Sequence, residues 1–104
     1  MNRFEEAKAL LRKTLPVARR VLGEDAQLTL GMRRNYAEAL YDDPSATLDD
    51  LREAVTMLED TDRIARRVLG GAHPSVAGIE GSLRSARAVL RAREEGKIVV
   101  ITDK

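Results

Sequence analysis

A repeated six-residue segment constrains the fold of this chain more than any other feature. Ala18–Gly23, with the sequence Ala-Arg-Arg-Val-Leu-Gly, returns unchanged 47 residues later as Ala65–Gly70. Four earlier residues return at the same offset, namely Glu6, Ala7, Leu11 and Thr14 as Glu53, Ala54, Leu58 and Thr61. A period of about 20 to 50 residues that spans a helix pair is typical of a solenoid, in which each hairpin buries its apolar face on its neighbours. We therefore expect an all-α chain of stacked helical hairpins.

Apolar periodicity predicts four helices, at about residues 3–22, 25–42, 46–69 and 74–95. In each of them apolar residues recur at three- and four-residue steps and therefore share one face. Asp25 is the expected N-cap of the second helix, Thr47 with Asp50 resembles a capping box, and Pro74 suits a first helical turn. Pro16 lies inside the first segment, and we prefer one kinked helix to two short ones because the apolar spacing continues through the proline.

Glycine and proline mark the ends of these helices. Gly23 and Gly70 can adopt positive φ at the ends of the first and third, and Pro44 follows the second. We expect Gly96 to end the fourth, so that a helical domain covers residues 1–95. The remaining tail, 96–104, contains four consecutive β-branched residues, Ile98–Ile101, which favour a strand. The tail is expected to be either disordered or strand-like.

Composition excludes several classes of function. Lys and Arg number 18 against 17 Asp and Glu, so net charge gives no steering toward nucleic acid or lipid. The chain has no cysteine, and its single histidine, His73, has no partners for a metal or catalytic site. The aspartates 42–43 and 49–50 lack the spacing of a calcium loop, and we assign them to helix capping. We predict a cytoplasmic protein that is not an enzyme and has no cofactor.

Several segments together resemble one repeat family. Phe4-Glu5-Glu6-Ala7 runs without a gap to Val21-Leu22-Gly23, and Val68-Leu69-Gly70 is followed by His73-Pro74. This pattern is similar to the kinesin-light-chain-like subtype of tetratricopeptide repeat proteins, and the similarity covers about residues 4–92. It implies a short tetratricopeptide-type solenoid of four helices that binds a peptide or partner protein on its concave face.

The resemblance also implies which residues line that face. In the family, first helices of each repeat line the groove, and here these are the second and fourth predicted helices. The residues carried over by position are Arg34, Asn35, Glu38 and Tyr41, followed by Gly81, Ser85 and Ala88. Arg34 could pair with an acidic side chain and Tyr41 could supply an apolar anchor. Glycines at 78 and 81 inside a helix indicate close approach, either of a neighbouring helix or of a ligand.

The chain departs from the family pattern in three places. Residues 43–50 contain an insertion of about five residues, which lengthens the repeat. Arg84 and Arg87 stand where a small and a large packing residue are usual, so we expect the fourth helix to be a cap with a solvated arginine face. The first helix corresponds to the second helix of a repeat, so either the sequence is a fragment of a longer array or another molecule covers that helix.

Two other functions stay open beside peptide binding. The module could assemble with copies of itself through the uncovered first helix, as a homo-oligomer. The arginine pairs at 19–20, 33–34 and 66–67 could instead contact nucleic acid, but nearby acids offset them and no aromatic platform interleaves them. We prefer protein or peptide binding as part of a larger scaffold.

Overall fold

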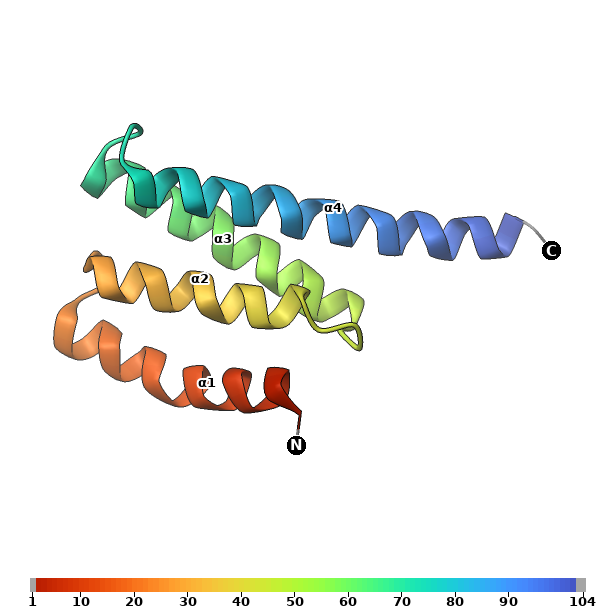
Figure 1. The fold of residues 1–104 in the computed structure, drawn as a ribbon, viewed down its shortest axis with the longest axis horizontal. Helices are drawn as coiled ribbons and strands as arrows, with labels where there is room; N and C mark the ends of the chain where they lie inside the picture. The colour runs from red at the N-terminus through yellow and green to blue at the C-terminus, as the bar shows by residue number, and fades with distance from the viewer. Residues whose placement is uncertain (1, 103–104) are drawn as a thin grey trace.

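The chain folds into four helices that confirm the all-α prediction. A computed structural model describes the backbone of residues 2–102 and the side chains of residues 2–96. The helices are α1 (Arg3–Leu22), α2 (Gln27–Tyr41), α3 (Leu48–Leu69) and α4 (Pro74–Thr102), and residues 2–102 contain no strand. Consecutive helices run antiparallel and pack side by side (Figure 1). In addition α2 contacts α4, whereas the backbones of α1 and α3 do not approach each other closely within the described part of the chain.

Local capping explains most of the helix boundaries. Thr47 and Asp50 form the predicted capping box, in which each side chain accepts a hydrogen bond from the backbone N–H of the other. Gly23 and Gly70 have φ of 99° and 87° directly after α1 and α3. Only glycine adopts this conformation without strain, so both helices end where the repeated segment ends.

Two boundary predictions on the first half of the chain have different outcomes. Pro16 lies inside a continuous α1, so the expectation of one helix rather than two is confirmed. Asp25 is not the N-cap of α2, because Ala26 holds that position without a side-chain hydrogen bond. The carboxylate of Asp25 lies 3.4 Å from the Arg67 guanidinium on α3 instead. Asp25 therefore links the turn before α2 to the end of α3 instead of capping α2.

The C-terminal end of α4 differs from the expectation. The helix continues through Gly96 to Thr102, so 96–102 are helical rather than a strand-like or disordered tail. A single glycine costs a helix about 1 kcal/mol relative to alanine, and no proline follows to interrupt the backbone hydrogen bonds. β-Branched residues cost still less each. Residues 103–104 of the predicted tail lie outside the described residues.

The core lies between α2, α3 and α4, with α1 packed on the far side of α2. Leu40 and Leu58 are fully buried, and Ile79 and Leu83 close the core from α4. Leu11 of α1 packs against the edge of this cluster. No single helix could bury its apolar stripe alone, so each depends on its neighbours, as expected for a repeat array.

Polar contacts of the 42–47 loop join this loop to the first and last helices. Lys8 of α1 is almost fully buried, and its ammonium lies 3.3 Å from the Asp43 carboxylate and 2.8 Å from Glu5. On the other side, the Arg93 guanidinium of α4 donates to the carbonyl of Ala46. The predicted insertion therefore contributes to the structure as a tie between α1 and α4.

The Lys8–Asp43 pair predicts a specific pH dependence of stability. The Ser45 backbone N–H and the Lys8 ammonium hold the pKa of Asp43 below its usual value of 3.8. A carboxyl with a depressed native pKa stabilises the fold fully above its unfolded pKa, and this contribution is lost as pH falls through the native pKa. Urea unfolding between about pH 2 and 6 should show that Asp43→Asn flattens the acid decline of the free energy of unfolding. Asp49→Asn, at an exposed carboxylate, is the control, and equal slopes for wild type and Asp43→Asn would contradict the assignment.

Candidate functional site

The predicted groove residues lie on a surface shared by α2 and α4. We name it the α2–α4 face and define it by Arg34, Glu38, Tyr41, Ser82 and the neighbouring Gly81, Ser85 and Ala88. The Arg34 Nε donates a hydrogen bond to Ser82 Oγ at 2.8 Å, and Ser82 Oγ donates to Glu38 Oε2 at 3.0 Å. Arg34 and Glu38 also form an ion pair at 3.5 Å. The two helices are therefore joined by a closed set of polar contacts.

Gly78 makes this arrangement sterically possible. A Cβ added at Gly78 would lie 2.6 Å from the Arg34 Nη1 atom, which is closer than real Cβ contacts allow. The guanidinium thus occupies the space that a side chain would fill, so the close approach predicted at Gly78 is confirmed. At Gly81 an added Cβ would meet nothing within 4 Å, so no neighbouring helix approaches it closely, and of the two predicted alternatives the approach of a ligand stays a prediction.

Tyr41 is half-buried at the end of α2 nearest the loop. Partial burial raises the pKa of its hydroxyl above the usual 10.0, and contact with Ser82 acts in the opposite direction. The phenol is neutral at physiological pH even at the usual pKa, and the upward shift acts in the same direction. Tyr41 therefore offers an apolar ring and a neutral hydroxyl beside the Arg34–Glu38 pair.

The other predicted groove residues do not join these contacts. Asn35 and Ser85 are exposed and form no side-chain hydrogen bond to the described residues. Sequence reasoning missed Ser82, which is the central partner of both Arg34 and Glu38. The sequence did contain a signal for Ser82. This residue stands 47 residues after Asn35, a predicted groove residue, and so holds the equivalent position in the next repeat unit.

A small hollow continues the α2–α4 face toward the 23–26 turn. Its volume is about 170 Å³, and Gln27 Nε2 bridges its rim by donating to Ser75 Oγ at 3.2 Å. The lining residues are Gln27, Leu30, Gly31, Arg34, Leu69, Ser75 and Ile79. Its apolar floor and the Arg34 guanidinium together suit a short side chain with a polar end.

The residues that the sequence offered as metal ligands or catalytic groups form hydrogen bonds that stabilise turns and helix ends. His73 Nδ1 accepts a hydrogen bond from the Ser75 backbone N–H at 3.0 Å, at the start of α4. Asp43 Oδ1 accepts from the Ser45 N–H, and Asp50 caps α3. Within the described residues no group of three or more histidines or carboxylates is placed to hold a metal ion. No helix among them is both long and apolar enough to cross a bilayer.

Comparison with known families agrees with this geometry. A tetratricopeptide repeat family model matches residues 1–25 and 45–75, a little more than half of the chain. The two matched segments contain α1 and α3, and each of them includes one copy of the repeated six-residue segment. The chain belongs to the tetratricopeptide repeat family, whose members generally mediate protein–protein interactions. Neither the curated proteins nor the solved structures contain a match.

The contact between Gly78 and Arg34 predicts how two glycine substitutions differ. Gly78→Ala should leave the helix intact, because alanine favours helix by about 1 kcal/mol over glycine, but it should displace the guanidinium from Ser82. The Arg34 Nε–Hε signal in a ¹H–¹⁵N spectrum should therefore shift in Gly78→Ala. Gly81→Ala is the matched control and should leave that signal in place. An unchanged signal in Gly78→Ala, or equal shifts in both variants, would refute the contact.

Proposed function

We propose that this chain is a non-catalytic binding module that takes a peptide, or a segment of a partner protein, on the α2–α4 face. The observation that carries this proposal is the Arg34–Ser82–Glu38 set of contacts. It fixes a cation and an anion side by side at the surface, where 38% of the Arg34 side chain remains exposed. Charged groups held in one orientation lose little entropy when they bind a partner.

The chemistry of the α2–α4 face favours a ligand with paired polar groups. Arg34 uses its Nε toward Ser82, so its outer N–H groups can donate to a carboxylate or a backbone carbonyl. Glu38 can accept from a backbone N–H or a lysine. Because the pair is electrically balanced, selection depends on hydrogen-bond matching and on the apolar contact with Tyr41 rather than on net charge.

Two finer assignments belong to the same proposal. The segments Phe4–Ala7 and His73–Pro74 support the kinesin-light-chain-like subtype. A cysteine-free sequence is compatible with a cytoplasmic scaffold, which is the location we propose.

Arg34→Glu tests the α2–α4 face. A partner is first captured from lysate of the source organism and identified by mass spectrometry, and its purified binding segment is then titrated against each variant. Losing a charge-assisted hydrogen bond and adding repulsion from Glu38 should weaken binding about tenfold to a hundredfold, with unchanged helical circular dichroism. Arg63→Glu, at an exposed arginine of α3, should change affinity little. Equal affinity of Arg34→Glu and wild type would show that the partner binds elsewhere.

A second candidate function, self-assembly, is favoured by the outward face of α1. Val17 is 46% exposed, and Leu10, Val21 and Leu22 are more exposed still. Val17, Val21 and Leu22 line an open hollow of about 440 Å³, together with Lys13, Thr14 and Ala18. Exposed apolar side chains gathered on one helix face are typical of interaction surfaces.

The charges of α1 favour a symmetric, antiparallel pair of copies. Glu5 and Glu6 lie in its first turn, and Arg19 and Arg20 lie in its last. Two-fold antiparallel pairing brings the acidic end of each α1 to the basic end of the other, with the apolar side chains between. Opposed helix dipoles act in the same direction.

Sedimentation equilibrium of Val17→Glu tests this second function. Wild type should show a mass that rises toward twice the chain mass with concentration, and Val17→Glu should stay monomeric because it places a charge in the paired apolar face. Val68→Glu is the control, since Val68 on α3 has a similar exposure of 43%. A wild-type monomer at high concentration would remove the self-assembly hypothesis.

A further inference from the structure

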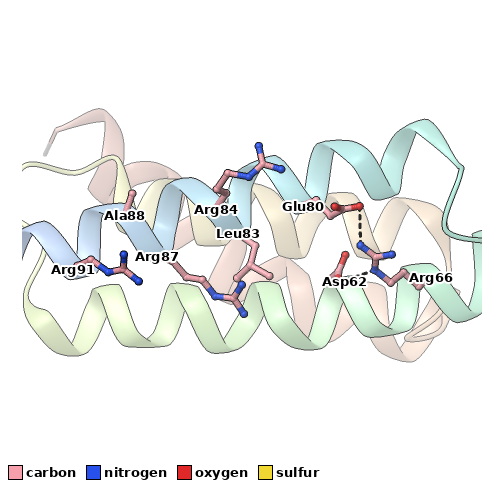
Figure 2. A pocket seen from close by; sticks show the side chains of 8 residues that line it. All are labelled: Asp62, Arg66, Glu80, Leu83, Arg84, Arg87, Ala88 and Arg91. Carbon is pink, nitrogen blue, oxygen red and sulfur yellow. Dashed lines mark hydrogen bonds and ion pairs between the residues drawn. The ribbon is translucent and has the colours of Figure 1, made fainter.

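A hollow between α3 and α4 adjoins the α2–α4 face at Ala88 and carries mostly positive charge. Its volume is about 480 Å³. Its lining residues are Asp62, Arg66, Glu80, Leu83, Arg84, Arg87, Ala88 and Arg91 (Figure 2). Four of them are arginines and two are acids, so the lining has an excess of cations.

The repeat shows how unusual these arginines are for their positions. Arg84 and Arg87 stand 47 residues after Ala37 and Leu40. Ala37 and Leu40 are 0% exposed and belong to the core shared by α2, α3 and α4. On α4 the same two places are exposed and charged. A helix that packed there as α3 packs on α2 would bury two guanidiniums, which is unfavourable unless that helix supplies carboxylates.

Among the side chains described for residues 2–96, the ion pairs of the hollow leave two of its arginines without an acidic partner. Arg66 is paired with Asp62 at 2.9 Å and with Glu80 at 2.7 Å, and Figure 2 shows these contacts at one end of the hollow. Arg87 pairs with Glu59 of α3 at 3.0 Å, between side chains that are each about half exposed. Arg84 and Arg91 form no ion pair with any side chain described for residues 2–96.

The spacing of the exposed arginines on α4 suits a helical ligand better than a single small ion or group. Arg84, Arg87 and Arg91 follow one another at steps of three and four, so they lie along one side of α4 over about 10 Å. Leu83 and Ala88 provide apolar surface beside them. A groove between two packed helices is also the usual seat for a third helix.

We propose that this surface, the arginine face (Arg84, Arg87 and Arg91 with Leu83 and Ala88), docks an acidic amphipathic helix of a partner protein. Carboxylates repeated at steps of three and four would meet the guanidiniums, which bind carboxylates through paired hydrogen bonds. Apolar side chains of the same helix would cover Leu83 and Ala88.

Charge complementarity also decides against a second copy of this chain as the occupant. Continuing the array head to tail would place the outward face of α1 on the arginine face. That face of α1 carries Lys13 within its apolar hollow, and Arg20 is exposed beside it. Cations would then meet cations in a partly buried contact, which is destabilising.

Fluorescence anisotropy with two synthetic peptides tests the arginine face on the full chain. The first is an amphipathic helical peptide of about 18 residues with Leu and Ala on one face and Glu at steps of three and four beside it; the second has Gln in place of each Glu. The Glu peptide should bind wild type at least about tenfold more tightly than the Gln peptide. Arg84→Glu/Arg91→Glu should remove at least about tenfold of that affinity. The control Arg20→Glu/Arg63→Glu makes the same change in net charge on α1 and α3, and it should bind the Glu peptide with wild-type affinity.

Other variants separate the possible outcomes. Arg34→Glu alters the α2–α4 face and should bind the Glu peptide as wild type does, so failure of the peptide-binding function leaves this test unaffected. Arg84→Gln/Arg91→Gln repeats the test without new charges if the glutamate variant does not fold. Equal binding of both peptides, or equal loss in the control variant, would overturn the proposal. Tighter, Arg84- and Arg91-dependent binding of a poly-uridine oligonucleotide would overturn it too, by assigning the surface to RNA.

Discussion

Burial of α2 against the other three helices is the contact on which the rest of the structure depends. α2 is the one helix of residues 2–102 that packs against each of the others. Its buried side chains, among them Leu30, Tyr36 and Leu40, form the centre of the apolar cluster. Tyr36 adds polar links, because its hydroxyl accepts from Arg12 of α1 and donates to Glu53 of α3. The position of α2 also determines where Arg34 and Glu38 meet α4.

Features governed by neighbouring residues could be read from the sequence. The capping box at Thr47 and Asp50, positive φ at Gly23 and Gly70, and the start of α4 at Pro74 each depend on a few adjacent positions. The 47-residue offset then identified the repeat and, through the family pattern, placed Arg34, Glu38 and Tyr41 on one face. Periodicity and capping are local rules, which is why they transfer without a structure.

Contacts between distant residues were beyond that reasoning. Ser82 joins Arg34 across 48 residues, and Lys8 meets Asp43 across 35, so neither pair has a local signature. The sequence predicted a close approach at Gly78 and Gly81 without deciding between a neighbouring helix and a ligand; the structure shows Arg34 of α2 close to Gly78 and no residue close to Gly81. The prediction that Gly96 ends α4 is wrong, because one glycine without a following proline is a weak barrier to a helix. The prediction that Asp25 caps α2 is also wrong, because its carboxylate forms an ion pair with Arg67 of α3, 42 residues away.

We propose the α2–α4 face as the primary binding surface, with Arg34, held by Ser82 and Glu38, at its centre. The most direct measurement is chemical-shift mapping of the ¹⁵N-labelled chain with its captured partner segment bound. We expect the largest changes at the Arg34 Nε–Hε group and at the amides of Glu38, Tyr41 and Ser82. Changes confined to α1, or to the outer side of α3, with those groups undisturbed, would contradict this proposal.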